Sequence, residues 1–384
     1  MKTLSLAKIL LTYLFFLFFS FIGGGADLNA QQVLWSRTDS TYNNFRIPSL
    51  IVTKKSTVLA FSEGREGGDS GDIDILLKRS EDGGRTWSKQ MLVWDDGTNT
   101  CGNPCPVVDR VTGRIFLWMT WNLGSDHEDG IIRKKSKDTR KPYLCYSDDD
   151  GLTWSEPVEM STSCKDPTWG WYATGPGVGI QLRSEKYKNR LIIPANHSYD
   201  VQDTTEAVRG GYGYGSHVIY SDDGGLSWTL GESITPGCNE SQVVELSNGD
   251  LMMNMRSYNQ KGCRAIAISN DGGASWSDIK HDPQLVESVC QASLIDYGSY
   301  KGKRRYLFSN PAVSSGRSHM TIKASHDDCQ TWNYGTMVHE GPAAYSCLTV
   351  LPDGSIGLFY EAGEKDPYEY LLFRSFEPDG LFQK

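Results

Sequence analysis

The sequence lacks an apolar run long enough to cross a membrane as a helix. Its longest run, residues 9–22, is shorter than the roughly 20 residues that a spanning helix needs. Lysines precede this run and small residues follow it, ending at Ala30. This pattern is typical of a signal peptide, so we predict that residues 1–30 are removed and that residues 31–384 form one exported domain, periplasmic or extracellular. An uncleaved membrane anchor is the alternative.

The sequence also lacks an overall excess of basic residues. Its 38 Lys and Arg residues are outnumbered by 47 Asp and Glu residues, and the net charge of -9 is spread along the chain. Nucleic-acid-binding domains concentrate positive charge, so we expect no nucleic acid partner. With 22% charged and 39% hydrophobic residues, the composition is that of a globular domain, which we expect to act as a monomer.

Cysteine is absent before Cys101, which excludes a lipid-anchored cysteine at the mature N-terminus. The nine cysteines are an odd number and widely spaced, although some could pair in an exported chain. Cys101 and Cys105 resemble half of a zinc site, but no second half with suitable spacing follows. We therefore predict small buried thiols and no metal site.

A repeat is the strongest positive signal in the sequence. The pattern Ser-x-Asp-x-Gly-x-Thr/Ser-Trp occurs at residues 80–87, 147–154, 221–228 and 269–276. A fifth copy, residues 325–332, carries Cys329 in place of the glycine. The aspartate can accept hydrogen bonds from turn amides, and glycine adopts backbone angles that other residues resist. We therefore interpret each copy as a structural turn whose tryptophan packs between neighbouring units.

Strand and hairpin signals recur in step with these turns. Strand-like runs occupy residues 74–79, 143–146, 217–220, 264–268, 320–324 and 370–374. Hairpin signals between apolar runs occupy residues 53–56, 111–113, 187–189, 247–250, 300–303 and 352–355. Because no long helical pattern follows residue 30, we predict an all-β fold, a six-bladed β-propeller with four-stranded antiparallel blades. A β-sandwich is the alternative, but it would not require a repeat.

This layout places a set of charged residues at one rim of the propeller. If the first strand of each blade runs down, then its start, the end of the second strand and the following connection all lie at the top. These positions hold Arg46, Arg65, Asp69, Asp72, Asp74, Glu240, Arg256, Arg317, Tyr345 and Glu361. A propeller brings its rims round one axis, so we expect a shared pocket.

Several segments in this order resemble the sialidase family. Phe45-Arg46-Ile47-Pro48 is similar to the Arg-Ile-Pro signature of that family, and the five turns are similar to its recurrent motif. Further resemblance lies at residues 103–106, 175–177, 240–243, 254–257, 345–346 and 359–361, and the whole covers about residues 33–375. The resemblance implies an exo-α-sialidase that hydrolyses terminal sialic acids from glycoproteins, glycolipids or oligosaccharides, with no cofactor.

The resemblance also implies how the sugar is held. Arg46, Arg256 and Arg317 would clamp the carboxylate of sialic acid, since arginine stays charged and offers a planar fork of donors. Glu361 would orient Arg46, and Arg65 would meet a sugar hydroxyl.

A tyrosine nucleophile is implied in the same way, as sialidases are an exception to the usual pair of carboxylates. A carboxylate would be repelled by the carboxylate of the substrate, whereas Tyr345 is neutral until it reacts. Ionising a phenol at pH 7 costs about 4 kcal/mol, which Glu240 would offset as a general base. Asp69 would be the general acid/base, with Asp72 and Asp74 as competitors in the same connection.

Other activities stay open at this point. A lectin would keep the arginines and lose the acid, base or tyrosine, and a structural propeller would leave the rim charges unexplained. A trans-sialidase or an intramolecular trans-sialidase would depend on rim aromatics, for which Trp121, Trp169, Trp171, Tyr199, Tyr212 and Tyr214 are candidates. Val178 stands where family members often have histidine, so we expect an altered pocket wall there.

Overall fold

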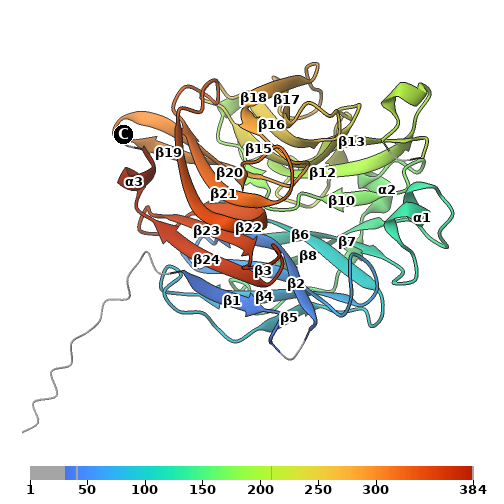
Figure 1. Cartoon of the computed structure of the whole chain (residues 1–384), viewed down its shortest axis with the longest axis horizontal. Helices are drawn as coiled ribbons and strands as arrows, with labels where there is room; N and C mark the ends of the chain where they lie inside the picture. The colour runs from blue at the N-terminus through green and yellow to red at the C-terminus, as the bar shows by residue number, and fades with distance from the viewer. Residues whose placement is uncertain (1–30, 40–41, 209, 383–384) are drawn as a thin grey trace, which may run out of the picture.

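The computed structural model describes residues 31–39, 42–208 and 210–382, and in this part of the chain the strands form six blades in a ring, which hydrogen bonds between some neighbouring blades join into four sheets. The chain passes once round the ring, from the blue strands through green and yellow to red (Figure 1). The predicted signal peptide, residues 1–30, lies outside the described residues. None of the described helices is long and apolar enough to cross a membrane.

The first four blades follow one another along the chain, and each is an antiparallel sheet. The first contains β2 (Asn44–Val52), β3 (Val58–Arg65), β4 (Ile73–Ser80) and β5 (Met91–Trp94). The second contains β6 (Thr100–Val108), β7 (Ile115–Asn122), β8 (Lys141–Ser147) and β9 (Val158–Glu159). The third contains β10 (Tyr172–Thr174), β11 (Ile180–Gln181), β12 (Leu191–Asp200), β13 (Tyr212–Ser221) and β14 (Thr229–Leu230). The fourth contains β15 (Cys238–Glu245), β16 (Leu251–Ser257), β17 (Cys263–Ser269) and β18 (Lys280–Val286).

The last two blades share a strand. The fifth contains β19 (Ser293–Tyr300), β20 (Lys303–Pro311), β21 (Ser318–Ser325) and the first half of β22 (Tyr334–Val350). The second half of β22 opens the sixth blade, which continues through β23 (Ile356–Ala362) and β24 (Tyr370–Phe376) to β1 (Gln32–Ser36). The first strand in the described sequence therefore closes the ring. In the third blade the inner strand is divided into β10 and β11, which both pair with β12. With these two segments counted as one strand, the predicted propeller of six four-stranded blades is confirmed.

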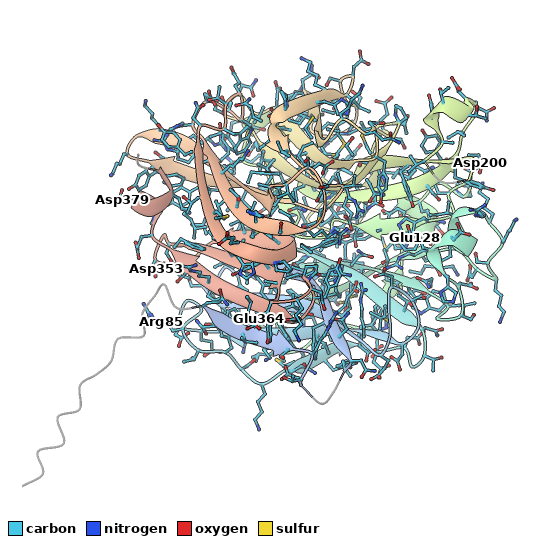
Figure 2. All side chains as sticks on the ribbon, viewed as in Figure 1. Arg85, Glu128, Asp200, Asp353, Glu364 and Asp379 are labelled. Atoms are coloured by element: carbon cyan, nitrogen blue, oxygen red, sulfur yellow. The ribbon has the colours of Figure 1, made fainter. Side chains whose placement is uncertain are left out.

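Helices are short and lie outside the blades. They are α1 (Glu128–Ile132), α2 (Ser161–Cys164), α3 (Pro378–Phe382) and the 3-10 turns η1 (Glu185–Tyr187) and η2 (Thr204–Glu206). Charged side chains such as Asp200 and Asp379 lie at opposite edges of the molecule (Figure 2).

The repeated motif forms the turn that the sequence predicts. In the first copy, Ser80 Oγ donates to Asp82 and accepts the amide of Gly84, while Asp82 accepts both the amide and the hydroxyl of Thr86. Gly84 has a φ of 89°, in the left-handed region that glycine adopts without strain. Cys329 replaces this glycine in the fifth turn and still adopts a φ of 63°.

The motif tryptophans pack across the boundaries between blades. Trp87 of the first blade meets Phe373 of the sixth edge-on at 5.1 Å, and Trp154 of the second meets Phe61 of the first at 5.7 Å. Such pairs bury large apolar surfaces and fix the angle between sheets. The turns are therefore structural, as predicted, and the ring is held by contacts between neighbours.

Four innermost strands carry a β-bulge near their upper ends. The register shifts between Arg46 and Ser49 in β2, Gly102 and Cys105 in β6, Cys238 and Ser241 in β15, and Ala343 and Ser346 in β22. A bulge inserts an extra residue and re-aims its side chain. Each of these four bulges turns a polar side chain toward the propeller axis.

Candidate active site

A cavity of about 290 Å³ opens at the upper end of the axis. It is lined by Arg46, Ile47, Arg65, Asp69, Asn103, Glu128, Arg140, Trp171, Ala173, Asn196, Asn239, Glu240, Arg256, Tyr258, Arg317, Tyr345 and Tyr368. Seven of the eight site residues expected from the sequence belong to this lining, and the eighth, Glu361, lies directly behind Arg46. The structure therefore brings together residues that are up to 315 positions apart.

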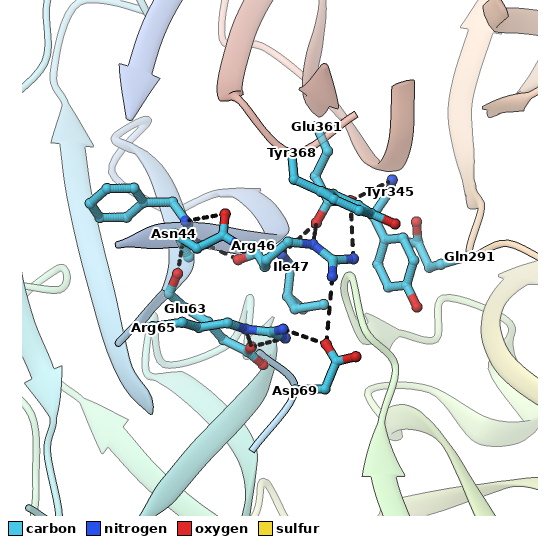
Figure 3. A network of polar contacts seen from close by, with 12 residues as sticks. Asn44, Arg46, Ile47, Glu63, Arg65, Asp69, Gln291, Tyr345, Glu361 and Tyr368 are labelled. Carbon is cyan, nitrogen blue, oxygen red and sulfur yellow. Dashed lines mark hydrogen bonds and ion pairs between the residues drawn. The ribbon is translucent and has the colours of Figure 1, made fainter. Parts of the chain in front are cut away.

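Arg46 is fixed by Glu361 across the junction of the first and sixth blades. Its Nε donates to Glu361 Oε1 at 2.7 Å and its Nη2 to Oε2 at 3.3 Å (Figure 3). Glu361 also accepts the amides of Ile47 and Tyr345, so its carboxylate ties both bulges together. Ile47 has a φ of 60°, which is strained for a β-branched residue and is held by these contacts.

The hydroxyl of Tyr345 lies between the carboxylate of Glu240 and the guanidinium of Arg256. It donates to Glu240 Oε1 at 2.6 Å and accepts from Arg256 Nη1 at 3.0 Å. Arg256 Nη1 also lies 2.7 Å from Glu240 Oε2, which closes a triangle of contacts. Burial raises the pKa of the Tyr345 phenol well above its usual value and Glu240 adds to this, while Arg256 and Arg317 oppose it. The phenol is therefore protonated at rest, with its proton aimed at Glu240.

Arg317 completes a set of three guanidinium groups round the Tyr345 ring. Its Nη1 donates to Tyr368 Oη at 2.7 Å, and its Cζ lies 5.5 Å from the centre of the Tyr345 ring. Among the described residues, no carboxylate lies within ion-pair distance of Arg317. Its positive charge is thus available to an anion in the cavity.

Asp69 faces these groups from the connection between β3 and β4. Its Oδ1 lies 2.5 Å from Arg65 Nη1 and 3.6 Å from Arg46 Nη1, and its side chain is 76% exposed (Figure 3). Partial loss of solvent around the carboxylate acts to raise the pKa of Asp69, but the positive charges of Arg65 and Arg46 outweigh this effect and lower the pKa below its usual range.

The two competing acids lie elsewhere. Asp74 is buried in β4 and accepts from Tyr42 Oη at 2.5 Å, with its pKa raised to about 6 chiefly by burial. Asp72 is half-buried, and neither acid belongs to the lining of the cavity.

The sequence did not single out a second layer of polar residues. Glu63, in β3, binds Arg65, and Arg140 donates to Thr120, Asn122 and Asn103 beneath the ring of Trp171. The sequence does not indicate that Arg140 lies at the rim, because it follows a long connection between β7 and β8. Glu63 lies two residues before the end of β3, where the alternation of side chains could have marked it as inward-facing.

Two expectations about the walls change with the structure. Of the six aromatic candidates, only Trp171 lines the cavity; Trp169 is buried and stacks on His197 at 3.5 Å. The predicted change of the cavity wall at Val178 is wrong, because Val178 does not line this cavity. It packs in the core and lines a second cavity of about 560 Å³ at the other end of the axis. Val178 lies in the segment between β10 and β11 and is buried there.

All nine cysteines are buried free thiols, including Cys101 and Cys105. In the described part of the chain, no group of three or more His, Cys, Asp or Glu side chains is placed to hold a metal ion.

The chain is similar in sequence and in structure to known proteins. The BNR repeat-like domain family matches residues 56–358. An exo-alpha-sialidase from Aspergillus fumigatus is 30% identical over 87% of this chain and 84% of its own length. The chain belongs to the sialidase family.

Two further sialidases show the extent of the family relationship. The sialidase of Micromonospora viridifaciens is 35% identical over 88% of this chain, which spans only 53% of that relative. The structure of a Hadza microbial sialidase superposes with a TM-score of 0.77 at 29% identity, covering 88% of this chain and 67% of the other. The chain thus spans about half to two-thirds of the length of these two relatives.

Proposed function

We propose that this sialidase-family chain is an exo-α-sialidase, which hydrolyses terminal sialic acids from glycoconjugates with retention of anomeric configuration. The observation that carries the proposal is the hydrogen bond of 2.6 Å from Tyr345 Oη to Glu240 Oε1 beneath three arginines. A phenol with an adjacent base is a nucleophile ready for activation.

The arginines fit the anionic end of the sugar. Arg46, Arg256 and Arg317 come from three blades and surround the Tyr345 ring, so a carboxylate among them would lie next to the phenol. Each charge-assisted hydrogen bond contributes roughly 1.5–3 kcal/mol. The clamp therefore selects an acidic sugar and presents its anomeric carbon, which bears the carboxylate, to Tyr345. Arg65, at the edge of the cavity, would meet a sugar hydroxyl.

The first half-reaction forms a bond between Tyr345 Oη and the anomeric carbon. The phenolic proton passes to Glu240, and the bond from the anomeric carbon to the leaving oxygen breaks. Asp69 gives its proton to that oxygen, so the aglycone leaves as an alcohol. A neutral nucleophile avoids the repulsion that a carboxylate would meet beside the clamped substrate.

The second half-reaction returns the enzyme to its starting state. Asp69 takes a proton from water, the resulting oxygen attacks the anomeric carbon, and the bond to Tyr345 breaks. Glu240 returns its proton to the phenolate. Two displacements at one carbon give net retention.

The other activities differ in what receives the sugar. A lectin would not need a phenol within 2.6 Å of a carboxylate, so this contact favours an enzyme. Transfer to a second glycan calls for aromatic platforms, and Trp171 alone of the six candidate aromatics lines the cavity. Water is therefore our proposed acceptor.

A fluorogenic sialoside tests the activity, and NMR of the first-formed sugar tests its configuration. We expect α-sialic acid as the initial product, whereas an anhydro sugar would indicate intramolecular transfer. A fluorinated sialic acid that carries a good leaving group should form a covalent bond with Tyr345, and peptide mass spectrometry can locate the labelled residue. Absence of hydrolysis would overturn the proposal.

We further propose that the enzyme is exported and acts as a monomer on sialylated glycans. N-terminal sequencing of the secreted protein should begin at Gln31. Light scattering should give the mass of one chain.

A further inference from the structure

A second Glu–Arg pair lies beside the one that holds Arg46. Glu63 is paired directly with Arg46 across β2 and β3, and its side chain is fully buried. Its Oε2 accepts from Arg65 Nε at 2.7 Å, and its Oε1 accepts the amide of Asn103 at 2.6 Å. Glu63 therefore fixes Arg65 against the second blade while pointing away from the centre of the cavity.

Arg65 joins this buried acid to the exposed one. Its Nε faces Glu63, and its Nη1 contacts Asp69 Oδ1 at 2.5 Å (Figure 3). The guanidinium thus divides its charge between two carboxylates. Glu63 is permanently in place, whereas Asp69 lies on an exposed connection and has to change its protonation state during the proposed reaction.

A general acid has to carry a proton, and arginines around it disfavour the protonated form. The cations that face Asp69 are Arg65 and Arg46 from its own blade and Arg140 from the second blade. All three favour the carboxylate over the carboxylic acid that must protonate the leaving oxygen. Glu361 balances the charge of Arg46, and Glu63 balances that of Arg65.

We propose that Glu63 is a positioning residue that, through Arg65, keeps Asp69 able to hold the proton it gives to the leaving oxygen. The inference deepens the proposed function and rests on it. Removing the charge of Glu63 leaves the full charge of Arg65 acting on Asp69, so the acid loses its proton at lower pH. Binding of the anionic substrate at the clamp acts in the same direction as Glu63, because it adds negative charge beside Arg46.

The leaving group separates this role from a purely structural one. A 4-nitrophenyl group departs as a stable anion and needs no proton, whereas the galactose of sialyl-lactose must be protonated as it leaves. In Glu63→Gln, the amide keeps its size and can still accept from Arg65. We expect kcat/KM for sialyl-lactose at pH 7 to fall about tenfold, one pKa unit of lost protonation, while that for the nitrophenyl sialoside changes less than about threefold.

The pH profile gives an independent readout. The alkaline limb of kcat/KM for sialyl-lactose should move to lower pH in Glu63→Gln and stay in place in Glu63→Asp, which keeps the charge. The double variant Glu63→Gln/Arg65→Gln removes both charges of the pair, so the limb should return at least to its wild-type position. This variant carries the test if Glu63→Gln alone does not fold.

Glu245→Gln is a matched control, because Glu245 is also a buried acid and pairs with Arg183 at the other end of the axis. In Glu245→Gln, the ratio of kcat/KM for sialyl-lactose to kcat/KM for the nitrophenyl sialoside should equal that of the wild type. If Glu63→Gln lowered kcat/KM equally for both substrates and left the alkaline limb of the pH profile in place, this inference alone would be overturned. Failure of the wild type to cleave either substrate would instead overturn the proposed function.

Discussion

Tyr345 donates a hydrogen bond of 2.6 Å to Glu240 although the two residues are 105 positions apart. The contact joins bulges on β22 and β15, two inner strands from different blades. Both side chains are nearly buried, so the proton can move between them without competition from bulk water. The geometry of the propeller therefore determines the acid–base chemistry of this phenol.

Replacing Tyr345 by Phe should abolish most hydrolysis while leaving the fold intact. We expect kcat to fall roughly 10³-fold or more, because the proposed nucleophile is removed. Stability should change little, since Arg256 still pairs with Glu240 at 2.7 Å. Tyr306→Phe is the matched control, as Tyr306 is a buried tyrosine bonded to Asp328 away from the cavity. Wild-type turnover in Tyr345→Phe would contradict the assignment.

Two arginines of the clamp should respond differently to substitution. Arg46→Met strands the buried carboxylate of Glu361 and should lower the free energy of unfolding by about 3–5 kcal/mol. Arg317→Met strands no carboxylate among the described residues, so its main effect should be a KM raised roughly 10- to 150-fold. Denaturant unfolding and steady-state kinetics measure the two effects. Equal destabilisation by both variants would argue against this division.

The fold should lose stability in mild acid because of a buried histidine pair. His197 Nδ1 lies 2.9 Å from His217 Nδ1, and burial lowers the pKa of His217 to about 3 and that of His197 well below its usual value. The unfolded chain binds protons near pH 6.5 and the folded chain does not, so stability rises with pH between about 3 and 6.5.

Two such groups give a slope of up to about 2.7 kcal/mol per pH unit inside that window. Urea unfolding at pH 7, 6 and 5 measures it. His217→Gln should reduce the slope, whereas the same substitution at exposed His127 should leave it unchanged. An unchanged slope in His217→Gln would rule out the histidine pair as its source.

Neighbouring glycines in the third turn offer a test of blade packing. A Cβ at Gly225 would lie 2.1 Å from the Phe116 ring of the second blade, whereas one at Gly224 would meet nothing within 4 Å. Both positions have a positive φ, which costs about 1–2 kcal/mol for alanine. We expect Gly225→Ala to destabilise by a further 1–3 kcal/mol, approximately the usual effect of overpacking. Both variants should keep wild-type kcat/KM if they fold, because the turns lie far from the cavity.

The repeated turns, and with them the six blades, follow from local sequence patterns. Serine, aspartate and glycine at fixed spacing form their turn through contacts within seven residues, so local chemistry is enough to predict it. The alternation of turns and hairpins also predicts that Arg46, Arg256 and Tyr345 lie at one rim.

Which of these groups come into contact depends on how the blades pack against one another. The bulges that aim Tyr345 at Glu240, the pairing of Glu63 with Arg65 and the position of Arg140 under Trp171 depend on neighbouring strands and blades. The use of β22 in two blades and the inward burial of Val178 were likewise beyond the sequence. The reason is physical: contacts between residues far apart in the chain form only when the ring closes, and no local pattern records its final register.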